Sequence, residues 1–497
     1  MELLLAPQPF LHPELSAQAQ AFIRIAYGLL LCGTIALAVP HWRRFFLSER
    51  WGGYAQPNVG VERVHNPVVA PLVLTLWAGC GLCIASGLWS PWPAVVNLLI
   101  CRYYFIAMRW KGLARGMGAP GHVLYWAGIC VVLLEYCARY APELHPLALQ
   151  VLQVDFAFIY LSSGFYKYSA GYPQNQGMEL GMANPAWGYW WRYYVGMPPS
   201  HVLFRTLNHL AWSSQIIAGF LMLIPPTRFI GGMIIVGMFM FVGSQIRLGL
   251  LCEVVILCSG LIFVHPGSLV DQILVSVIGA VPTPPLQSFP GSDIFNVGLR
   301  VFLGAYLILI PLAHAGLSYN FYLRRSLPMP IQRVLEAYTN FFGLIVWRVF
   351  SVDLVNFFIR VYRPSEDHPD GRQLISNYGW QGRFRFDHVV ESITLACIFT
   401  SLKYYPSNNA VFEERLLRYA KTFAQPPHGI LLFEYVSVVK EPDRFAFVPV
   451  ALYAVNLDTA TVTEELLNAV ISPRAAHAVS PVHEGLRPGT YAPSGGR

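Results

Sequence analysis

Nine apolar segments follow one another along residues 17–313, and they restrict the fold of this chain more than any other feature. The segments lie near residues 17–39, 68–89, 92–108, 123–141, 147–167, 207–225, 228–243, 244–265 and 295–313. A helix of about 20 apolar residues crosses the hydrocarbon core of a bilayer, where only helices and closed barrels satisfy the backbone. The sequence therefore predicts an all-α polytopic membrane protein with about nine transmembrane helices.

The composition supports this prediction and excludes one class of partner. The chain is 55% hydrophobic and 12% charged, whereas about a quarter of the residues in soluble globular proteins are charged. Its net charge of +7 is modest, and no Lys/Arg tract with interleaved aromatic residues is present. We therefore expect contact with membrane lipid and no binding of nucleic acid.

The chain beyond the apolar segments is expected to form interfacial helices and a small soluble-type domain. Residues 268–282 and 331–350 are apolar but amphipathic, as is typical of interfacial helices. The polar run RPSEDHPDGRQ, which begins near residue 362, indicates a linker. The expected domains are a transmembrane helical domain at 1–320, an interfacial helix and linker at 321–362, a small α+β soluble domain at 363–471 and a disordered tail at 472–497.

Within the small C-terminal α+β domain, the pattern predicts the order strand, helix, strand, strand. Residues 392–400, 430–439 and 446–455 are rich in β-branched and aromatic residues and are expected to be strands. NNAVFEERLLRYAKTF is expected to be an amphipathic helix with Asn409 as its N-cap.

The distribution of basic residues predicts the orientation in the membrane. The 40–67 loop carries Arg43, Arg44, Arg50 and Arg63, whereas the 266–294 loop has no Lys or Arg. Loops rich in Lys and Arg stay on the cytoplasmic side. With nine spans, we expect the N-terminus outside, the C-terminal domain in the cytoplasm, and location in the inner or plasma membrane if the protein is bacterial.

Lys167 is the first candidate for chemistry. Gln153, Tyr160 and Lys167 are spaced by seven and share one helix face, and Ser163 lies one turn before the lysine. Gly164 would let another backbone or a flat ligand come close. Burial disfavours the ammonium form of a lysine, and a neutral amine can act as a general base. The alternative is a lysine that extends from a helix end to the membrane interface.

His122 is the second candidate. It follows Gly121 at the start of an apolar segment, where a helix N-terminus would favour the neutral imidazole as a hydrogen-bonding group. A histidine at the membrane interface is the alternative. Histidines occur singly and no zinc-type spacing is present, so we expect no metal site.

Three motifs, taken in order, resemble the vitamin K-dependent gamma-carboxylase family, including its horizontally transferred transmembrane domain (HTTM) members. They are FIRIAYGLLL (22–31), GHVLYW (121–126) and FIYLSSGFYK (158–167), and the resemblance covers about residues 15–320. It implies a lyase that uses a reduced, vitamin K-like quinone together with oxygen and CO2. By the same resemblance Lys167 would be the base that deprotonates the quinone, His122 would assist, and Tyr160 would line the pocket. Gly164, Ser163 and Gln153, which lie beside the lysine or share its helix face, are the expected cofactor-binding residues.

Two departures keep another class of function open. The family usually continues from the lysine to a W-x-x-G motif, whereas this chain reads YSAGYPQNQGMELG. The chain also lacks the large region with which animal carboxylases bind a substrate protein, although a protein or peptide substrate remains a candidate partner. The segment around SGFYKYSAG resembles lipase maturation factors as well, which implies a non-catalytic membrane assembly factor. A transporter ranks last, since no internal repeat is evident.

Overall fold

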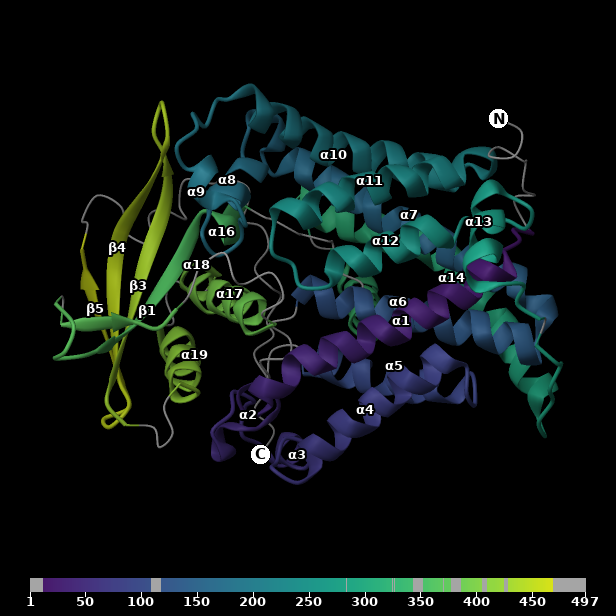
Figure 1. Ribbon diagram of the computed structural model, residues 1–497, viewed down its shortest axis with the longest axis horizontal. Helices are drawn as coiled ribbons and strands as arrows, with labels where there is room; N and C mark the ends of the chain where they lie inside the picture. The colour runs from purple at the N-terminus through teal and green to yellow at the C-terminus, as the bar shows by residue number, and fades with distance from the viewer. Residues whose placement is uncertain are drawn as a thin grey trace.

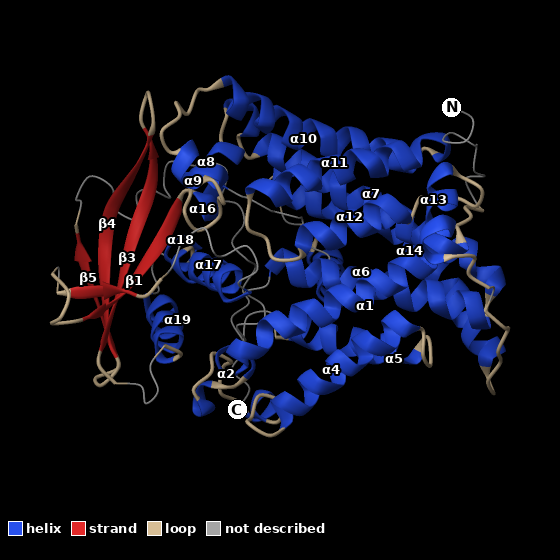
Figure 2. Ribbon diagram, in the orientation of Figure 1, coloured by secondary structure: helices blue, strands red, loops and turns tan. Residues whose placement is uncertain are grey.

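The computed structural model describes residues 12–108, 118–282, 284–323, 325, 327–342, 352–369, 371–376, 386–404, 409–423 and 428–467. A helical bundle is followed by a five-stranded antiparallel sheet with helices packed beside it (Figure 1). Figure 2 shows that all strands gather at one end of the molecule. The expected tail at 472–497 lies outside the described residues.

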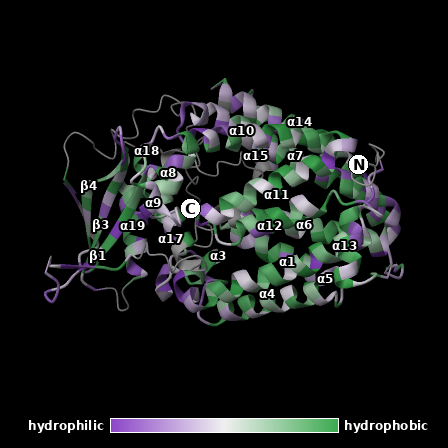
Figure 3. Cartoon of the chain, turned by 45° about the horizontal axis from the view of Figure 1, so that its top comes forward, coloured by the Kyte–Doolittle hydropathy of each residue, from purple (hydrophilic) through white to green (hydrophobic). Residues whose placement is uncertain are grey.

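The nine expected apolar segments all form helices in the bundle. These are α1 (Ala17–Ala38), α4 (Val69–Ser86), α5 (Trp92–Cys101) with the π-helical turn η3 (Arg102–Ala107), α6 (Gly118–Tyr140), α7 (His145–Ser169), α10 (Val202–Leu223), α11 (Arg228–Gln245), α12 (Leu251–Leu261) and α14 (Ser292–Tyr322). Figure 3 shows hydrophobic residues along most of these helices and more hydrophilic ones near the sheet.

Six helices of the described chain are long and apolar enough to cross a membrane. They cover Ala17–Phe46, Val69–Ser86, Gly121–Tyr140, Pro142–Ser169, Pro225–Gln245 and Ser292–Asn320. The apolar helices at Trp92–Ala107 and Leu251–Leu261 are shorter. Helix α10 has 22 residues, but polar side chains such as Asn208 and Gln215 lower its hydropathy. The expectation of membrane-length apolar helices is therefore confirmed for six of the nine segments.

Shorter elements connect the long helices. They are η1 (Val39–His41), α2 (Trp42–Phe46), η2 (Glu49–Trp51), α3 (Val59–Glu62), η5 (Pro142–Leu144), η6 (Tyr172–Gln174), α8 (Met178–Ala183), α9 (Trp191–Tyr194), η7 (Pro225–Thr227), α13 (Leu269–Ile278), α15 (Met329–Phe342) and α16 (Val352–Val355). Helices α13 and α15 occupy the two expected amphipathic segments, with residues 343–350 outside the described part of the chain.

The sheet has the strand order β2-β1-β3-β4-β5, with every pair antiparallel. Its strands are β1 (Phe357–Pro364), β2 (Arg372–Leu374), β3 (Ile430–Lys440), β4 (Phe445–Asn456) and β5 (Thr461–Leu466). The strands expected at 430–439 and 446–455 are confirmed, and α19 (Asn409–Lys421) confirms the expected helix. Strand β1 begins inside the segment that was expected to be a linker.

One expected element is wrong, because residues 392–400 form most of a helix and not a strand. Helix α17 runs from Phe386 to Phe399 and is followed by α18 (Ser401–Tyr404). The side chains of Val390, Leu395 and Phe399 are buried in the same apolar core as residues of the bundle and the sheet. A short, mostly apolar run has the same pattern in a buried helix and in a buried strand. Packing in the core, and not β-propensity, therefore decides the structure of residues 392–400.

The bundle has two distinct ends. At one end, Ser16 N–H donates to Val264 O (2.8 Å) and the Ser16 hydroxyl to the Asp271 carboxylate, which joins the start of α1 to α13. At the other end, Arg44 pairs with Glu391 (2.5 Å) and Lys421 with Glu49 (2.5 Å), which joins the α1–α4 connection to α17 and α19. We call the second one the sheet end.

Candidate functional site

Close packing of α7 on α10 positions the first candidate residue. A methyl group added at Gly164 of α7 would lie 2.6 Å from Ile216 Cγ1 and 3.0 Å from Trp212 O of α10. One added at Gly219 of α10 would lie 2.5 Å from Leu161 Cγ of α7. Small residues let helix backbones approach each other. Gly164 therefore makes room for another backbone, which was one of the two roles expected for it.

Lys167 lies in this α7–α10 interface near the sheet end. Its side chain is only 4% exposed, so it does not extend into the surroundings. The amine Nζ donates to Ser163 Oγ at 2.9 Å and to Gln215 Oε1 at 2.9 Å. Both acceptors are neutral, and Lys167 has no ion pair within the part of the chain that the structure describes.

Tyr160 and Gln153 share the α7 face with Lys167 but lie farther along the helix. A rise of 1.5 Å per residue puts them roughly 10 Å and 21 Å from the lysine along the axis. Tyr160 is fully buried between Phe156 (centroids 4.9 Å apart) and Phe239 (6.1 Å). Gln153 donates to Ile262 O (2.8 Å) and accepts from Arg228 (3.0 Å). The structure thus places Gln153 in a different polar cluster from Lys167.

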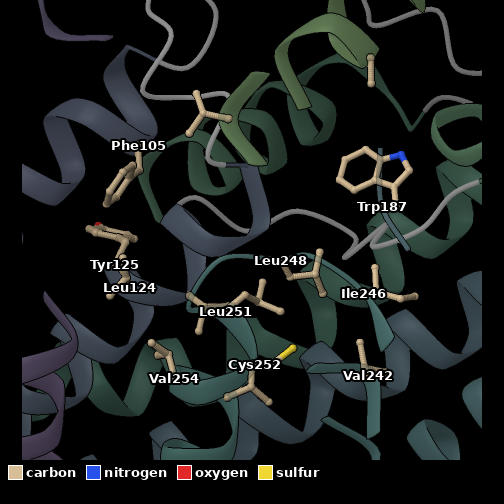
Figure 4. Close-up of a cluster of buried hydrophobic side chains, with 14 of the residues drawn as sticks. Phe105, Leu124, Tyr125, Trp187, Val242, Ile246, Leu248, Leu251, Cys252 and Val254 are labelled. Carbon is tan, nitrogen blue, oxygen red and sulfur yellow. The ribbon is translucent and has the colours of Figure 1, made fainter. Parts of the chain in front are cut away.

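His122 is buried near the start of α6, at the sheet end. Its neighbour Gly121 packs against the η3 turn, since a methyl group there would lie 2.6 Å from Phe105 Cδ1. Figure 4 shows Phe105 beside Tyr125 of α6. A hydrogen bond from Trp126 Nε1 to Asp155 Oδ2 (2.8 Å) shows that these two residues lie at about the same height along the bundle axis. His122 lies one turn beyond that bond, and hence about two turns, roughly 12 Å, from the level of Lys167.

Glu135 is a buried charge of the bundle that lies between two arginines. Glu135 contacts Arg24 (3.7 Å) and Arg139 (3.6 Å), and it accepts from Ser90 (2.6 Å). This cluster lies at the end of the bundle away from the sheet, where it joins α1, α6 and the α4–α5 connection. Arg24 of the first motif therefore has a structural partner. Among the described residues, no group of three or more His, Cys, Asp or Glu side chains could hold a metal ion.

Sequence reasoning missed Gln215 and a second polar group at the sheet end. Glu179 of α8 is fully buried and pairs with Lys440 of β3 (2.6 Å). Asn208 of α10 also donates to Glu179 Oε2 (2.6 Å). A glutamate in the apolar stretch MELGMA was the available signal, but its partner lies 261 residues further on. No family model, curated protein or solved structure matches this chain.

Proposed function

We propose that this is an integral membrane protein in which Lys167 acts as a general base toward a lipid-soluble hydroquinone. The observation that carries the proposal is the pairing of a buried amine with two neutral acceptors, Ser163 Oγ and Gln215 Oε1. The resemblance of FIYLSSGFYK to the vitamin K-dependent carboxylases points to the same residue and the same class of substrate.

The number of hydrogen-bond donors supports a basic role for Lys167. An ammonium group has three N–H donors, whereas the described residues supply Nζ with two acceptors. A neutral amine would satisfy both acceptors with its two N–H bonds and keep a lone pair that can accept a proton. Ser163 and Gln215 would then hold the amine in place while it takes the proton of a hydroxyl group.

A buried donor next to this site is compatible with a hydroquinone. Trp212 lies one turn before Gln215 on α10, and its Nε1–H has no acceptor among the described residues. A hydroquinone oxygen could accept from it while a hydroxyl group faces Lys167. Tyr168, which packs against Trp212 with ring centroids 5.0 Å apart, is 55% exposed and could contact a ligand that arrives from the lipid. The quinol itself would supply the reducing equivalents for chemistry with oxygen.

The test measures turnover and binding with variants of Lys167. Purified protein in lipid nanodiscs is incubated with reduced vitamin K and oxygen, and quinone epoxide is quantified by chromatography. We expect epoxide from the wild type and at least a hundredfold less from Lys167→Arg and Lys167→Met, because neither side chain can accept the proton. Lys421→Arg, which keeps a half-buried cation facing Glu49, is the matched control and should retain activity.

A non-catalytic assembly factor is the second candidate, and one observation favours it. The Lys167 amine joins α7 to α10 through Gln215, so it can act as a structural tie without any substrate. In that case Lys167→Met should lower the thermal midpoint, and no hydroquinone should raise the midpoint of the wild type at saturating concentration. Absence of both epoxide and a thermal shift would therefore exclude the enzymatic proposal.

We further propose that the bundle crosses the membrane nine times with the sheet in the cytoplasm. The connections at the sheet end carry Arg43, Arg44, Arg50 and Arg63, and the 266–294 connection at the opposite end carries no Lys or Arg. Green fluorescent protein fused to the C-terminus should therefore fluoresce in a bacterial host. Alkaline phosphatase inserted after Gly279 should be active. The reverse pair of signals would contradict this orientation.

A further inference from the structure

A second cluster of polar side chains lies at the sheet end, on elements other than α7 and α10. Ser48 follows α2, His65 follows α3, and Tyr103 and Tyr104 belong to the π-helical turn η3. The His65 ring lies 5.8 Å from the Tyr103 ring and 5.7 Å from the Tyr104 ring. Ser48 N–H donates to His65 O at 2.9 Å. The four residues therefore form one contiguous group.

Each member of this group has a buried polar atom without a partner in the described part of the chain. Ser48 and Tyr104 are 0% exposed and His65 is 1% exposed. Ser48 Oγ, His65 Nε2 and the hydroxyl groups of Tyr103 and Tyr104 have no hydrogen-bond partner among the described residues. A buried polar atom without a hydrogen bond destabilises the folded state. Four such atoms lie on contiguous residues, and two of them belong to a π-helical turn, a rare element that recurs at functional sites. We take this as the mark of a missing ligand.

The chemistry of the group defines what it can bind. His65 Nδ1 lies 3.1 Å from Phe46 O, so Nδ1 carries the hydrogen and Nε2 presents a lone pair. Burial lowers the pKa of His65 to about 4, which keeps the ring neutral near pH 7. The three hydroxyl groups can donate or accept. The site as a whole carries no formal charge, so its ligand should be uncharged and should both donate and accept a hydrogen bond.

We propose that Ser48, His65, Tyr103 and Tyr104 bind the hydroxyl group of a small uncharged phenol. One hydroxyl group can donate to His65 Nε2 and accept from a tyrosine. The lining of the group is aromatic, since Trp77 stacks on Tyr104 (centroids 5.5 Å apart, planes at 17°) and Phe46 meets it edge-on at 5.1 Å. Aromatic rings prefer such stacked and edge-on neighbours, and a phenol ring is the ligand body that matches them. This site is independent of the role proposed for Lys167, since the two share no residue and no helix.

The experiment compares phenol with toluene, which has a similar shape but no hydroxyl group. The full-length protein in nanodiscs is titrated with each compound, and the thermal midpoint is followed. We expect phenol but not toluene to raise the midpoint of the wild type. Tyr104→Phe and His65→Phe should each weaken the apparent affinity for phenol at least tenfold, and Ser48→Ala serves as a smaller second change in case either variant does not fold. Lys167→Met should bind phenol like the wild type.

Tyr27→Phe is the matched control for loss of a buried hydroxyl group. Tyr27 is 0% exposed, and its hydroxyl donates to Leu124 O (3.0 Å) and accepts from Asn97 (2.8 Å), so both roles are used within the protein. Its removal should lower the midpoint and leave phenol binding intact. Without ligand, Tyr104→Phe should not lower the midpoint, because it removes an unsatisfied group.

Three results would overturn the proposal. A loss of stability in Tyr104→Phe equal to that in Tyr27→Phe, with no response to phenol, would mean that ordered water alone occupies the site. An equal response to phenol and toluene would mean an apolar cavity. Unchanged phenol affinity in both Tyr104→Phe and Ser48→Ala would place phenol elsewhere in the molecule.

Discussion

Buried polar side chains in this protein differ in how completely they are hydrogen bonded. Trp77 Nε1 donates to Asn97 Oδ1 (2.8 Å), Asn97 donates to the Tyr27 hydroxyl (2.8 Å), and that hydroxyl donates to Leu124 O. These hydrogen bonds join four helices, and each of the polar groups named takes part in at least one of them. The amine of Lys167 and the imidazole of His65 are each only partly used, and partly used groups are where binding or proton transfer can occur.

The neutral form of His65 gives a prediction about stability and pH. In the folded protein burial lowers the pKa of His65 to about 4 from the 6.5 of an exposed histidine. Between these values the unfolded chain binds more protons than the folded chain, so the free energy of unfolding falls as pH decreases from about 6.5 to about 4. The loss should reach about 3 kcal/mol near pH 4, measured by denaturant unfolding in detergent at several pH values.

His65→Phe is the variant that isolates this effect. It keeps an aromatic ring between Tyr103 and Tyr104 but has no group that titrates, so its stability should change less with pH over the same interval. Equal pH dependence in the wild type and in His65→Phe would assign the loss of stability to other groups.

At the candidate site, the sequence predicted only the relative positions of residues on the same helix. Ser163 and Lys167 were placed one turn apart, and in the structure the lysine donates to the serine hydroxyl at 2.9 Å. Gln215 lies 48 residues away, and its contact depends on which helices pack together, which spacing along one helix does not reveal. Gln153 was grouped with Lys167 because a spacing of seven repeats the face, but fourteen residues of helix separate the two side chains by roughly 21 Å.

Glycines determine how closely the helices pack. Gly28 of α1 faces α4, where an added methyl group would lie 2.6 Å from Gly81 O. Gly164 faces α10 in the same way, and there the close approach also brings Gln215 within reach of Lys167. The small residue and the lysine of the SG-x-x-K motif therefore depend on the same helix–helix contact.

Gly164→Ala is predicted to destabilise the protein by about 1–3 kcal/mol, because the new methyl group would meet Ile216 and the α10 backbone. Gly237→Ala on α11 is the control, since nothing lies within 4 Å of its added methyl group. The control should be neutral or slightly stabilising. Thermal midpoints in one detergent would measure both changes. Equal midpoints for the two variants would contradict close packing of α7 on α10.

The sequence predicted helices and strands correctly where the pattern of apolar residues fits only one type of secondary structure. Each long apolar segment became a helix, and the two strands expected at 430–439 and 446–455 are present. Residues 392–400 are mostly apolar, and helix α17 buries Leu395, Ile398 and Phe399 in the core that the bundle and the sheet share. Strand β1 is a strand where none was expected. Its buried residues Phe357, Ile359 and Val361 directly precede the polar run that was expected to be a linker, and this polar run masked the pattern of the strand.

On the scale of the whole molecule, the sheet and the bundle are joined by contacts between residues far apart in the sequence. Asn184, after α8, donates to Val355 O (2.7 Å) and Phe357 O (2.8 Å) at the start of β1. Phe445 N–H of β4 donates to Val195 O at 2.9 Å. These contacts fix the sheet on the connection that leads from Lys167 at the end of α7 to α10.

The ion pair between Glu179 and Lys440 is the most sensitive of these connections. Glu179 is 0% exposed, and both of its oxygens are engaged, one with Lys440 and the other with Asn208. Lys440→Met would leave the buried Glu179 carboxylate without its cation. Because the carboxylate is buried, water cannot solvate the unpaired charge. The cost should be about 2–3 kcal/mol, at the low end for a buried pair because Lys440 is itself 31% exposed.

Arg444→Met provides the matched control, because Arg444 and Glu441 form an ion pair that is 64% and 37% exposed on the same β3–β4 hairpin. Water and salt screen such a pair, so its loss should change stability very little. Limited proteolysis adds a local measurement. If the Glu179 pair holds the sheet on the bundle, Lys440→Met should expose the 171–201 connection to cleavage at temperatures where Arg444→Met stays intact. Equal cleavage of both variants would mean that Asn184 and the shared apolar core hold the sheet in place without the ion pair.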